Sequence, residues 1–328
     1  MNIFLNSKIL FFIFILAFLF GIGLIKYLRP ILIKYFPDSP NKRSSHKSIK
    51  PRAGGIVFVL VTFIFTLIFN QDYLFSILIC TLLGIVSLID DKINLSSKIR
   101  YSAQLLVVIL LFLNSNLYQV YLSFKYQDSF LLFLVSFFIV FISTGIINFI
   151  NFMDGLDGLV SGCMLIIIST SFYLFELNWL LPLIGSLLAF LFWNWDPSKL
   201  FMGDVGSTFL GAIFVAIIFS TTDIEKILGI ILVSSPLMLD AISCIARRIL
   251  NKQNIFRAHK LHLYQRLNQS GIRHSTVSLI YISSTLLISV FMIFYGLIFA
   301  AFLSFLIICL GFYFDRNIAI PFLIASRK

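Results

Sequence analysis

Long apolar stretches recur along almost the whole chain, and they constrain its fold more than any other feature. Of its 328 residues, 59% are hydrophobic and only 12% are charged. A water-soluble protein cannot bury that much apolar surface, so a lipid bilayer must act as the solvent for most of this chain. We therefore predict an all-α fold, a polytopic helical bundle in a membrane.

The stretches predict about eleven transmembrane helices, or ten if the last two merge. A helix needs about 20 residues to cross the hydrocarbon core, and the fourth stretch is shorter than that. The first stretch has no small-residue cleavage signature, so we expect it to remain as a span. The eleven stretches are 9–28, 54–70, 73–89, 101–113, 129–147, 159–176, 178–194, 207–222, 227–246, 275–294 and 297–313.

No separate soluble domain is visible, so we expect one transmembrane domain over residues 1–328, with the polar motifs concentrated between residues 38 and 267. The four cysteines lie inside apolar runs without the spacing of metal ligands, and we interpret them as small core residues. They are Cys80, Cys163, Cys244 and Cys309.

Lysine and arginine are distributed unevenly between the two ends of the predicted bundle. Of the 25 basic residues, 22 fall on one face, and only Lys8, Lys125 and Lys226 fall on the other. Because cytoplasmic loops carry the excess of Lys and Arg, we expect the N-terminus outside and the C-terminus in the cytoplasm.

Aspartates collect at that same basic face. An aspartate at mid-bilayer costs roughly 2.5–3.5 kcal/mol on insertion scales, so these carboxylates are expected at the wet interface. Taken alone, the first pair could equally be a helix end that faces water. Five aspartates end or follow apolar stretches here: Asp90, Asp91, Asp154, Asp157 and Asp204.

The segment 148–158 contains no basic residue, although it lies on the basic face. Asn148, Asn151 and Asp154 are spaced by three and share one face if the turn stays helical, and Asp157 continues that spacing. Two carboxylates about 4 Å apart repel by about 4 kcal/mol at an effective dielectric of 20, so this loop beside other aspartates requires a cation. Oxygen ligands favour Mg²⁺ or Mn²⁺ over zinc. The alternative is an ordinary Asn/Asp/Gly turn.

Three further segments on this face admit two interpretations each. Residues 201–207 could bind a ligand or only form a turn that caps the next helix. Residues 40–55 carry cations and a Gly-Gly step that suit a phosphate cradle, although cytoplasmic loops are basic anyway. In residues 247–274, His259 and His262 are three apart and Arg266 follows a turn later. Surface histidines are often incidental, but this set suits a diphosphate.

Together these motifs resemble those of the polyprenyl-phosphate N-acetylhexosamine-1-phosphate transferases, glycosyl transferase family 4. The resemblance covers roughly residues 38–267. It rests on Asp90-Asp91, on Asn148-x-x-Asn151-x-x-Asp154-Gly-x-Asp157-Gly, and on Phe201-Met-Gly-Asp204-x-Gly-Ser207.

Two other elements are similar to the branch that acts on O-antigen-type amino sugars. They are Pro40-Asn41-x-Arg43-Ser-Ser-His46 and His259-x-x-His262-x-Tyr264-Gln265-Arg266. Tyr264 and Gln265 stand where other branches have two histidines. This difference argues against a UDP-N-acetylmuramoyl-pentapeptide donor.

The resemblance implies a reaction at the cytoplasmic face of a bacterial inner membrane. Undecaprenyl phosphate would attack the β-phosphate of a UDP-N-acetylamino sugar and give undecaprenyl-diphospho-sugar and UMP, the first step of an O-antigen-like cell-surface polysaccharide. The implied partners are these two substrates and the lipid bilayer, with a homodimer left open and no nucleic acid. The main alternative is a transporter or flippase for a lipid-linked or nucleotide sugar.

The resemblance also implies a role for each candidate. Asp204 and Asn151 would hold Mg²⁺, for which Mn²⁺ could substitute. The catalytic candidates are Asp90, Asp91 and His262, the aspartates by orienting or deprotonating the lipid phosphate. Asp157 would read the uracil with Phe201 stacking on it, Arg100 would hold the lipid phosphate, and the histidines with Arg266 would grip the diphosphate or sugar. The substrate-binding candidates are thus Asn148, Asp154, Asp157, Phe201, Arg100, His259 and Arg266.

Overall fold

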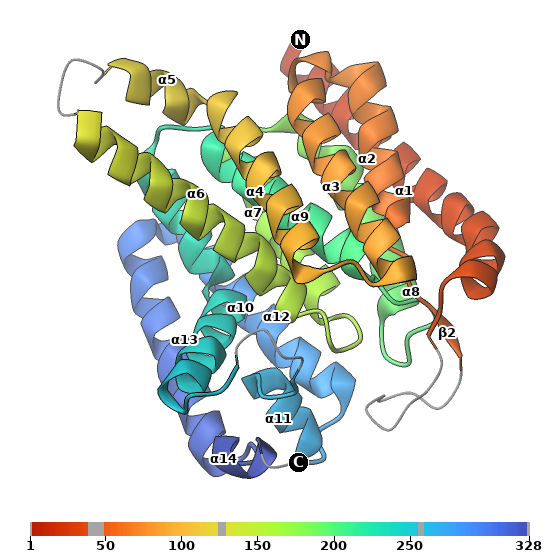
Figure 1. Ribbon diagram of the computed structural model, residues 1–328. Helices are drawn as coiled ribbons and strands as arrows, with labels where there is room; N and C mark the ends of the chain where they lie inside the picture. The colour runs from red at the N-terminus through yellow and green to blue at the C-terminus, as the bar shows by residue number, and fades with distance from the viewer. Residues whose placement is uncertain (1, 39–48, 124–128, 255–258, 327–328) are drawn as a thin grey trace.

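The structure is a computed structural model, and it describes residues 2–38, 49–123, 129–254 and 259–326. Within these ranges almost every element is a helix, and the one pair of strands is the short antiparallel pairing of β1 (Pro37–Asp38) with β2 (Lys50–Pro51). Figure 1 shows the helices side by side as a bundle. The predicted all-α fold of a multi-pass membrane protein is confirmed.

Each of the eleven predicted stretches coincides with one helix of the structure. Apolar stretches match helices because a segment in lipid needs apolar side chains and must pair its own backbone groups, which a helix does. The helices are α1 (Asn2–Tyr35), α2 (Ile56–Phe69), α3 (Leu74–Ile93), α4 (Ser97–Leu113), α6 (Ser129–Phe152), α7 (Leu159–Phe175), α8 (Leu181–Asn194), α9 (Asp204–Phe219), α10 (Ile224–Leu250), α12 (His274–Tyr295) and α13 (Leu297–Asn317).

Three short helices were not expected from the sequence. They are α5 (Asn116–Ser123), α11 (Leu263–Gln269) and α14 (Phe322–Ala325). Two 3-10 turns, Gln71–Tyr73 and Asn178–Leu180, come directly before α3 and α8. Of these elements, α11 matters most for function, because it carries part of the histidine motif.

Six of the helices are long and apolar enough to cross a membrane by length and composition. They comprise α1, α3 with its preceding turn, α6, α10, α12 and α13. Four other apolar helices have only 10–17 residues: α2, α7, α8 with its preceding turn, and α9. The number of spans beyond six therefore stays a prediction.

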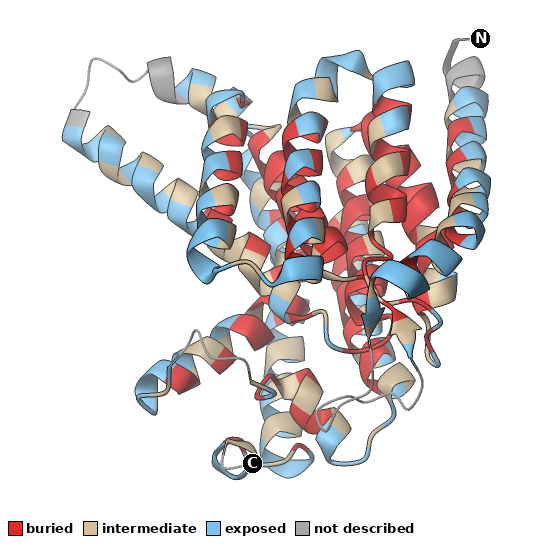
Figure 2. Cartoon of the chain, turned by 45° about the vertical axis from the view of Figure 1, so that its right-hand side comes forward, coloured by how far each residue is buried: buried red, intermediate tan, exposed pale blue. Residues whose placement is uncertain are grey.

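Helix α9 occupies the centre of the bundle, and every residue from Val205 to Phe219 is buried. It packs mainly against α3 and α6, with further contacts to α2 and α4. Figure 2 shows the buried residues gathered inside the bundle, while exposed residues cover its outside. Because Asp204 is the first residue of this central helix, the packing of α9 fixes the position of that carboxylate.

Large apolar side chains cover the outside of α6 and α13. Phe133 and Phe141 are exposed on α6, and Ile298 and Phe302 on α13. Such a surface is stable in lipid rather than in water, which agrees with a membrane location. The two ends of the described chain lie at opposite ends of the bundle (Figure 1). Which end faces the cytoplasm stays a prediction from the basic residues.

Candidate active site

Segments from four parts of the chain meet about midway down the view in Figure 1, above α11 and α14. They are the end of α3, the loop between α6 and α7, the loop between α8 and α9, and the start of α9. Hydrogen bonds and ion pairs between these segments, described below, show that the meeting is direct. The segments lie up to about a third of the chain apart in sequence, so the fold itself assembles the site.

Arg100, on the first turn of α4, lies between two of the predicted aspartates. Its Nη1 atom is 3.3 Å from Oδ2 of Asp90 and 3.9 Å from Oδ2 of Asp204. Asp90 is 6% exposed and also accepts a hydrogen bond from the Leu95 backbone N–H at 2.6 Å. The Asp90 carboxylate is therefore held in place by two donors, while Arg100 is partly open to solvent and within reach of an anion.

Asp91 joins the end of α3 to the start of α9. Its Oδ2 atom accepts a hydrogen bond from the backbone N–H of Val205 at 3.3 Å. A helix start has unpaired N–H groups that favour such an acceptor. Gly203 lets the two segments approach, because it has φ +74° and a Cβ there would lie 2.7 Å from Asp91 Oδ2. Asp91 therefore lies directly beside the start of α9, where Asp204 is the first residue.

Asn151, at the end of α6, faces the same turn of α9. Its Oδ1 atom accepts a hydrogen bond from the Ser207 hydroxyl at 2.5 Å. Ser207 lies three residues after Asp204, so both project from one face of α9. The structure thus brings Asn151 next to Asp204. Asn148, one turn earlier, instead donates to Gln104 at 2.7 Å on α4.

Asp154 lies among the other carboxylates in the loop after α6. Desolvation, and then the negative charges of Asp204, Asp91 and Asp157, raise the pKa of Asp154 to about 8. Burial is the largest cause of this rise, and repulsion from the neighbouring carboxylates adds to it. A bound cation would relieve that repulsion.

Asp157 lies in a separate part of the site, where its Oδ2 atom accepts one hydrogen bond and faces two basic side chains. The Ser198 backbone N–H is 3.0 Å away, His274 Nδ1 is 3.8 Å away, and Lys50 Nζ is 4.0 Å away. Burial raises the pKa of Asp157, but His274, Ser198 and Lys50 outweigh it and lower the pKa overall. The Asp157 carboxylate is therefore ionised at neutral pH.

Phe201 lies beside the charged groups around Asp157. Lys50 Nζ lies 5.1 Å from the centre of the Phe201 ring, and the Phe201 backbone bonds both Pro51 and Gly54. Asp157 and Phe201, the two residues predicted to bind the uracil, are thus linked through Lys50. Neither Ser198 nor His274 was singled out from the sequence.

Asn194, at the end of α8, is another residue that the sequence did not single out. Its Oδ1 atom accepts hydrogen bonds from Gly158 N–H at 3.1 Å and from the Ser161 hydroxyl at 2.7 Å. Its Nδ2 atom donates to the Leu200 carbonyl at 3.0 Å. This buried amide ties the acidic loop after α6 to the loop that contains Phe201.

The histidine motif forms a second group beside the carboxylates. His262 is 2% exposed, and its ring stacks on those of His259 and Tyr264, with centres 5.1 and 5.7 Å away. Its Nδ1 atom lies 3.7 Å from Oδ1 of Asp240. Burial lowers the pKa of His262, but Asp240 and Cys244 together outweigh burial and raise it to about 9. Burial lowers the pKa of His259 to about 4.

Tyr264 connects this second group to the acidic loop. Its hydroxyl donates to the Phe152 carbonyl at 3.0 Å, and its backbone N–H donates to Asp240 at 3.0 Å. Phe152 also faces the His262 ring, with centres 6.4 Å apart. His259 and His262 are therefore neighbours of the acidic loop.

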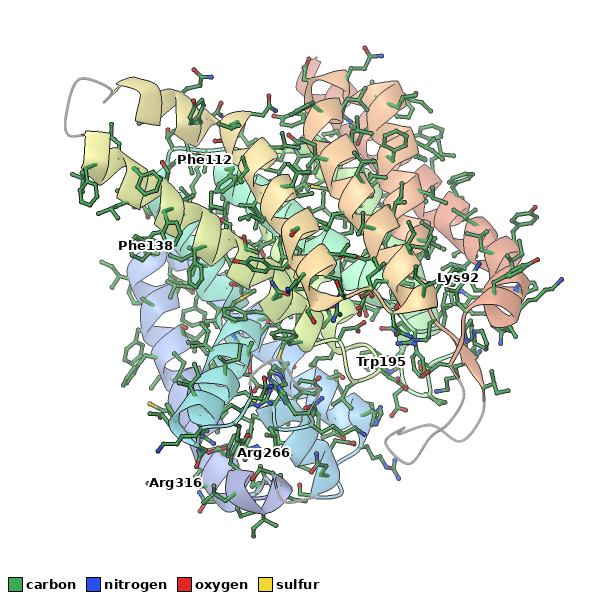
Figure 3. The ribbon with its side chains drawn as sticks, in the orientation of Figure 1. Lys92, Phe112, Phe138, Trp195, Arg266 and Arg316 are labelled. Atoms are coloured by element: carbon green, nitrogen blue, oxygen red, sulfur yellow. The ribbon has the colours of Figure 1, made fainter. Side chains whose placement is uncertain are left out.

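Arg266 has a different environment from the one expected. It is 3% exposed, pairs with Asp315, and donates to the Leu261 and Ile320 carbonyls at 3.0 Å each. Figure 3 places Arg266 and Lys92, at the end of α3, on opposite sides of Trp195. The structure does not bring Arg266 to the carboxylate group. The basic segment with Arg43 and His46 lies outside the described residues.

The donors around Asp204 and Asn151 suit a hard divalent cation. Both offer oxygen atoms, Asn151 faces the first turn of α9 from the end of α6, and Ser207 fixes the orientation of the Asn151 amide. Mg²⁺ is typically held by one or two carboxylates together with substrate phosphates and water. The chemistry of this set fits Mg²⁺ or Mn²⁺ better than zinc, because the nearby ligands are oxygens.

Comparison with known proteins identifies the family. The model of glycosyl transferase family 4 matches residues 73–222. The probable undecaprenyl-phosphate N-acetylglucosaminyl 1-phosphate transferase of Bacillus subtilis (strain 168) is 32% identical over a match of 296 positions, which covers 80% of this chain and 82% of that protein. This chain belongs to glycosyl transferase family 4. The family predicted from the motifs is thereby confirmed.

Other family 4 relatives carry different names. A phospho-N-acetylmuramoyl-pentapeptide-transferase of Caldanaerobacter subterraneus subsp. tengcongensis is 32% identical over 312 residues, 87% of this chain and 96% of that protein. An undecaprenyl-phosphate alpha-N-acetylglucosaminyl 1-phosphate transferase of Yersinia pestis is 28% identical over 279 residues, 78% of this chain and 76% of that protein. All three names describe phospho-sugar transferases, which supports an enzyme.

Proposed function

We propose that the chain transfers an N-acetylamino-sugar 1-phosphate from a UDP-sugar to undecaprenyl phosphate. A phosphate oxygen of the lipid would attack the β-phosphorus of the donor. The bond from that phosphorus to the oxygen bridging the two phosphates would break, and UMP would leave. The observation that carries the proposal is the meeting of Asp90, Arg100 and Asp204 at the start of the central helix, beside the acidic loop. The transferase names of the relatives point the same way.

The residues divide into a lipid-phosphate part and a donor part. Arg100, partly open and paired with Asp90, is placed to receive the anionic lipid phosphate, and Asp90 would orient it or accept its proton. Phosphoryl transfer depends mostly on alignment and on neutralising charge. A cation held by Asp204 and Asn151 would supply the charge neutralisation at the diphosphate.

The donor part would use Asp157, Phe201 and the histidines. The ionised Asp157 can accept a hydrogen bond from the uracil N–H, and the Phe201 ring offers a stacking surface. His259 and His262 border the acidic loop, where contact with the diphosphate or sugar is expected. Arg266 is buried in its own ion pair, so we propose a supporting role for it instead.

The proposal also concerns which sugar the donor carries and which polymer the product starts. Relatives act on N-acetylglucosaminyl and on muramoyl-pentapeptide donors by name. Tyr264 and Gln265 in place of histidines favour an N-acetylamino sugar without a peptide. We propose that the lipid-linked product starts a cell-surface polysaccharide such as an O-antigen, with the site on the cytoplasmic side of a bacterial inner membrane. Family membership favours this transferase over the transporter alternative.

A donor panel tests the proposal. Detergent-purified protein would receive undecaprenyl phosphate, Mg²⁺ and one UDP donor at a time: the GlcNAc, QuiNAc and FucNAc donors and UDP-N-acetylmuramoyl-pentapeptide. We expect UMP release that needs both lipid and Mg²⁺, with a lipid product whose mass gains one amino-sugar phosphate. Release with the pentapeptide donor alone would overturn the donor assignment, and release without lipid would overturn the transfer.

A further inference from the structure

Three side chains that are separated in the sequence form a group beside the carboxylate site. Cys244 comes from the buried face of α10, and His259 and His262 come from the segment before α11. One ligand atom from each, a thiol sulfur and two imidazole nitrogens, lies within 4.8 Å of the other two. Cys244 and His262 are both 2% exposed, and His259 is half-buried.

The types of ligand atom indicate which cation this group would take. A thiolate and two imidazoles are softer ligands than the oxygens around Asp204, and such sets bind zinc rather than magnesium. The two groups would therefore select different metals within one protein.

The surroundings of His262 resemble those of a zinc-binding histidine. Metal-bound imidazoles usually turn their second nitrogen toward a carboxylate, and here Asp240 Oδ1 lies 3.7 Å from His262 Nδ1. That nitrogen is buried and has no hydrogen-bond partner among the described residues. With Asp240 beside Nδ1, the opposite nitrogen, Nε2, remains for a ligand.

Asp240 itself is firmly oriented. It accepts hydrogen bonds from the Leu263 N–H at 2.7 Å, the Tyr264 N–H at 3.0 Å and the Tyr281 hydroxyl at 2.7 Å. A buried carboxylate with three donors is a fixed feature, so the ring beside it has a defined partner. This arrangement is independent of the sulfur of Cys244 and supports the same conclusion.

The distances require only a small adjustment. Zinc bonds of about 2.3 Å to sulfur and about 2.0–2.1 Å to nitrogen place tetrahedral ligand atoms about 3.5 Å apart. Ligand atoms within 4.8 Å must therefore close by at most about 1.3 Å. His259 can supply the movement, because it is half-buried and its Nδ1 holds only a 3.3 Å bond from Leu261 N–H.

We propose that Cys244, His259 and His262 form a zinc site, with the fourth position open to water or to an anionic oxygen. A ring nitrogen that binds zinc cannot also donate to a phosphate. In the zinc-bound protein the two histidines would therefore reach a diphosphate only through that open position. The proposal goes beyond the transferase activity, and its test measures metal rather than turnover.

Metal retention by the full-length, tag-free protein in detergent tests the proposal. The protein would be stripped with a chelator, loaded with a small excess of Zn²⁺ in the presence of millimolar Mg²⁺, desalted and assayed for zinc. We expect about one zinc per chain. Cys244→Ser should weaken binding at least as much as the roughly 10–100-fold loss seen when a metal-bound histidine loses its carboxylate partner.

Cysteine and histidine variants provide the controls. Cys309→Ser removes an exposed cysteine on α13 that is not part of the group, so it should leave zinc binding unchanged. Loading with Co²⁺ should give a sulfur-to-cobalt charge-transfer band in wild type and Cys309→Ser but not in Cys244→Ser. If Cys244→Ser does not fold, His259→Gln serves instead and should weaken zinc binding. No retained zinc in wild type, or equal retention in the variants, overturns the proposal.

Discussion

The hydroxyl of Tyr264 donates a hydrogen bond to the backbone carbonyl of Phe152, 3.0 Å away. This bond joins the histidine segment to the end of α6, where the acidic loop begins. Tyr264 is fully buried, and its backbone is fixed by Asp240. Tyr264 therefore connects the segment before α12 to the end of α6, directly before the acidic loop.

The contact between Tyr264 and Gly155 gives the first prediction. A Cβ at Gly155 would lie 2.3 Å from the Tyr264 hydroxyl oxygen, so Gly155→Ala should push the acidic loop away and cost about 1–3 kcal/mol of stability. We expect transferase activity to fall together with the thermal midpoint. Both can be measured on detergent-purified protein.

The double variant Gly155→Ala/Tyr264→Phe provides the matched test of that contact. Removing the hydroxyl relieves the closest clash, so activity and midpoint should recover relative to Gly155→Ala alone. If the losses of the two single variants simply add in the double variant, the Tyr264 hydroxyl is not what the alanine side chain collides with.

Arg266 gives the second prediction, which separates a structural role from substrate contact. Breaking a buried ion pair by removing one partner typically costs about 3–5 kcal/mol. Arg266→Ala should therefore lower the thermal midpoint strongly. Any surviving folded protein should keep a KM for the UDP donor near that of wild type. A raised KM with an unchanged midpoint would instead support contact with the diphosphate.

Asn194 gives the third prediction. Asn194→Ala leaves Gly158 N–H and the Leu200 carbonyl without their buried partner, and an unsatisfied group of this kind costs about 1–3 kcal/mol. We expect faster hydrogen exchange in the acidic loop and in residues 195–203, measured by mass spectrometry. Ser161→Ala, which removes only one donor to the same amide, should have a smaller effect. Unchanged exchange in Asn194→Ala would contradict the link.

The lowered pKa of Asp157 gives a prediction about pH. A carboxyl whose pKa is lower in the folded state contributes stability above its unfolded pKa, about 3.9, and loses it as pH falls through the folded value. The midpoint of wild type should therefore exceed that of Asp157→Asn near pH 7, and the difference should shrink below about pH 4. A difference that does not change with pH would contradict the assigned charge.

The sequence predicted the fold class, and it singled out polar residues that the structure brings together, because both depend on local features. Apolar length identified the helices, and polar residues at the ends of apolar stretches identified Asp90, Asp91, Asn151 and Asp204. These residues lie near one another because α9 is buried at the centre of the bundle. A run of apolar residues suggests that a helix is buried, but it does not specify which helices surround it.

The remaining contacts depend on residues that are distant in sequence. Asp157 is surrounded by Lys50, Ser198 and His274, which come from three separate segments. Arg266 shares its motif with two histidines, yet it pairs with Asp315 near the end of the chain.

Cys244 illustrates the same limit for the cysteines. It was interpreted as a core residue because its spacing from the histidines is unlike that of a known metal motif. Only the packing of α10 against the segment before α11 brings its sulfur near two imidazoles.

The most direct test of the account compares UMP release by Asp204→Asn and Asp223→Asn. Asp223 caps α10 away from the site, and asparagine caps a helix equally well, so this control should keep wild-type activity. Asp204→Asn should lose about 10²–10³-fold in UMP release, the usual effect of removing one group that stabilises developing charge, while its thermal midpoint in detergent stays close to that of the control. Wild-type UMP release by folded Asp204→Asn, with unchanged Mg²⁺ dependence, would contradict the assignment of the site.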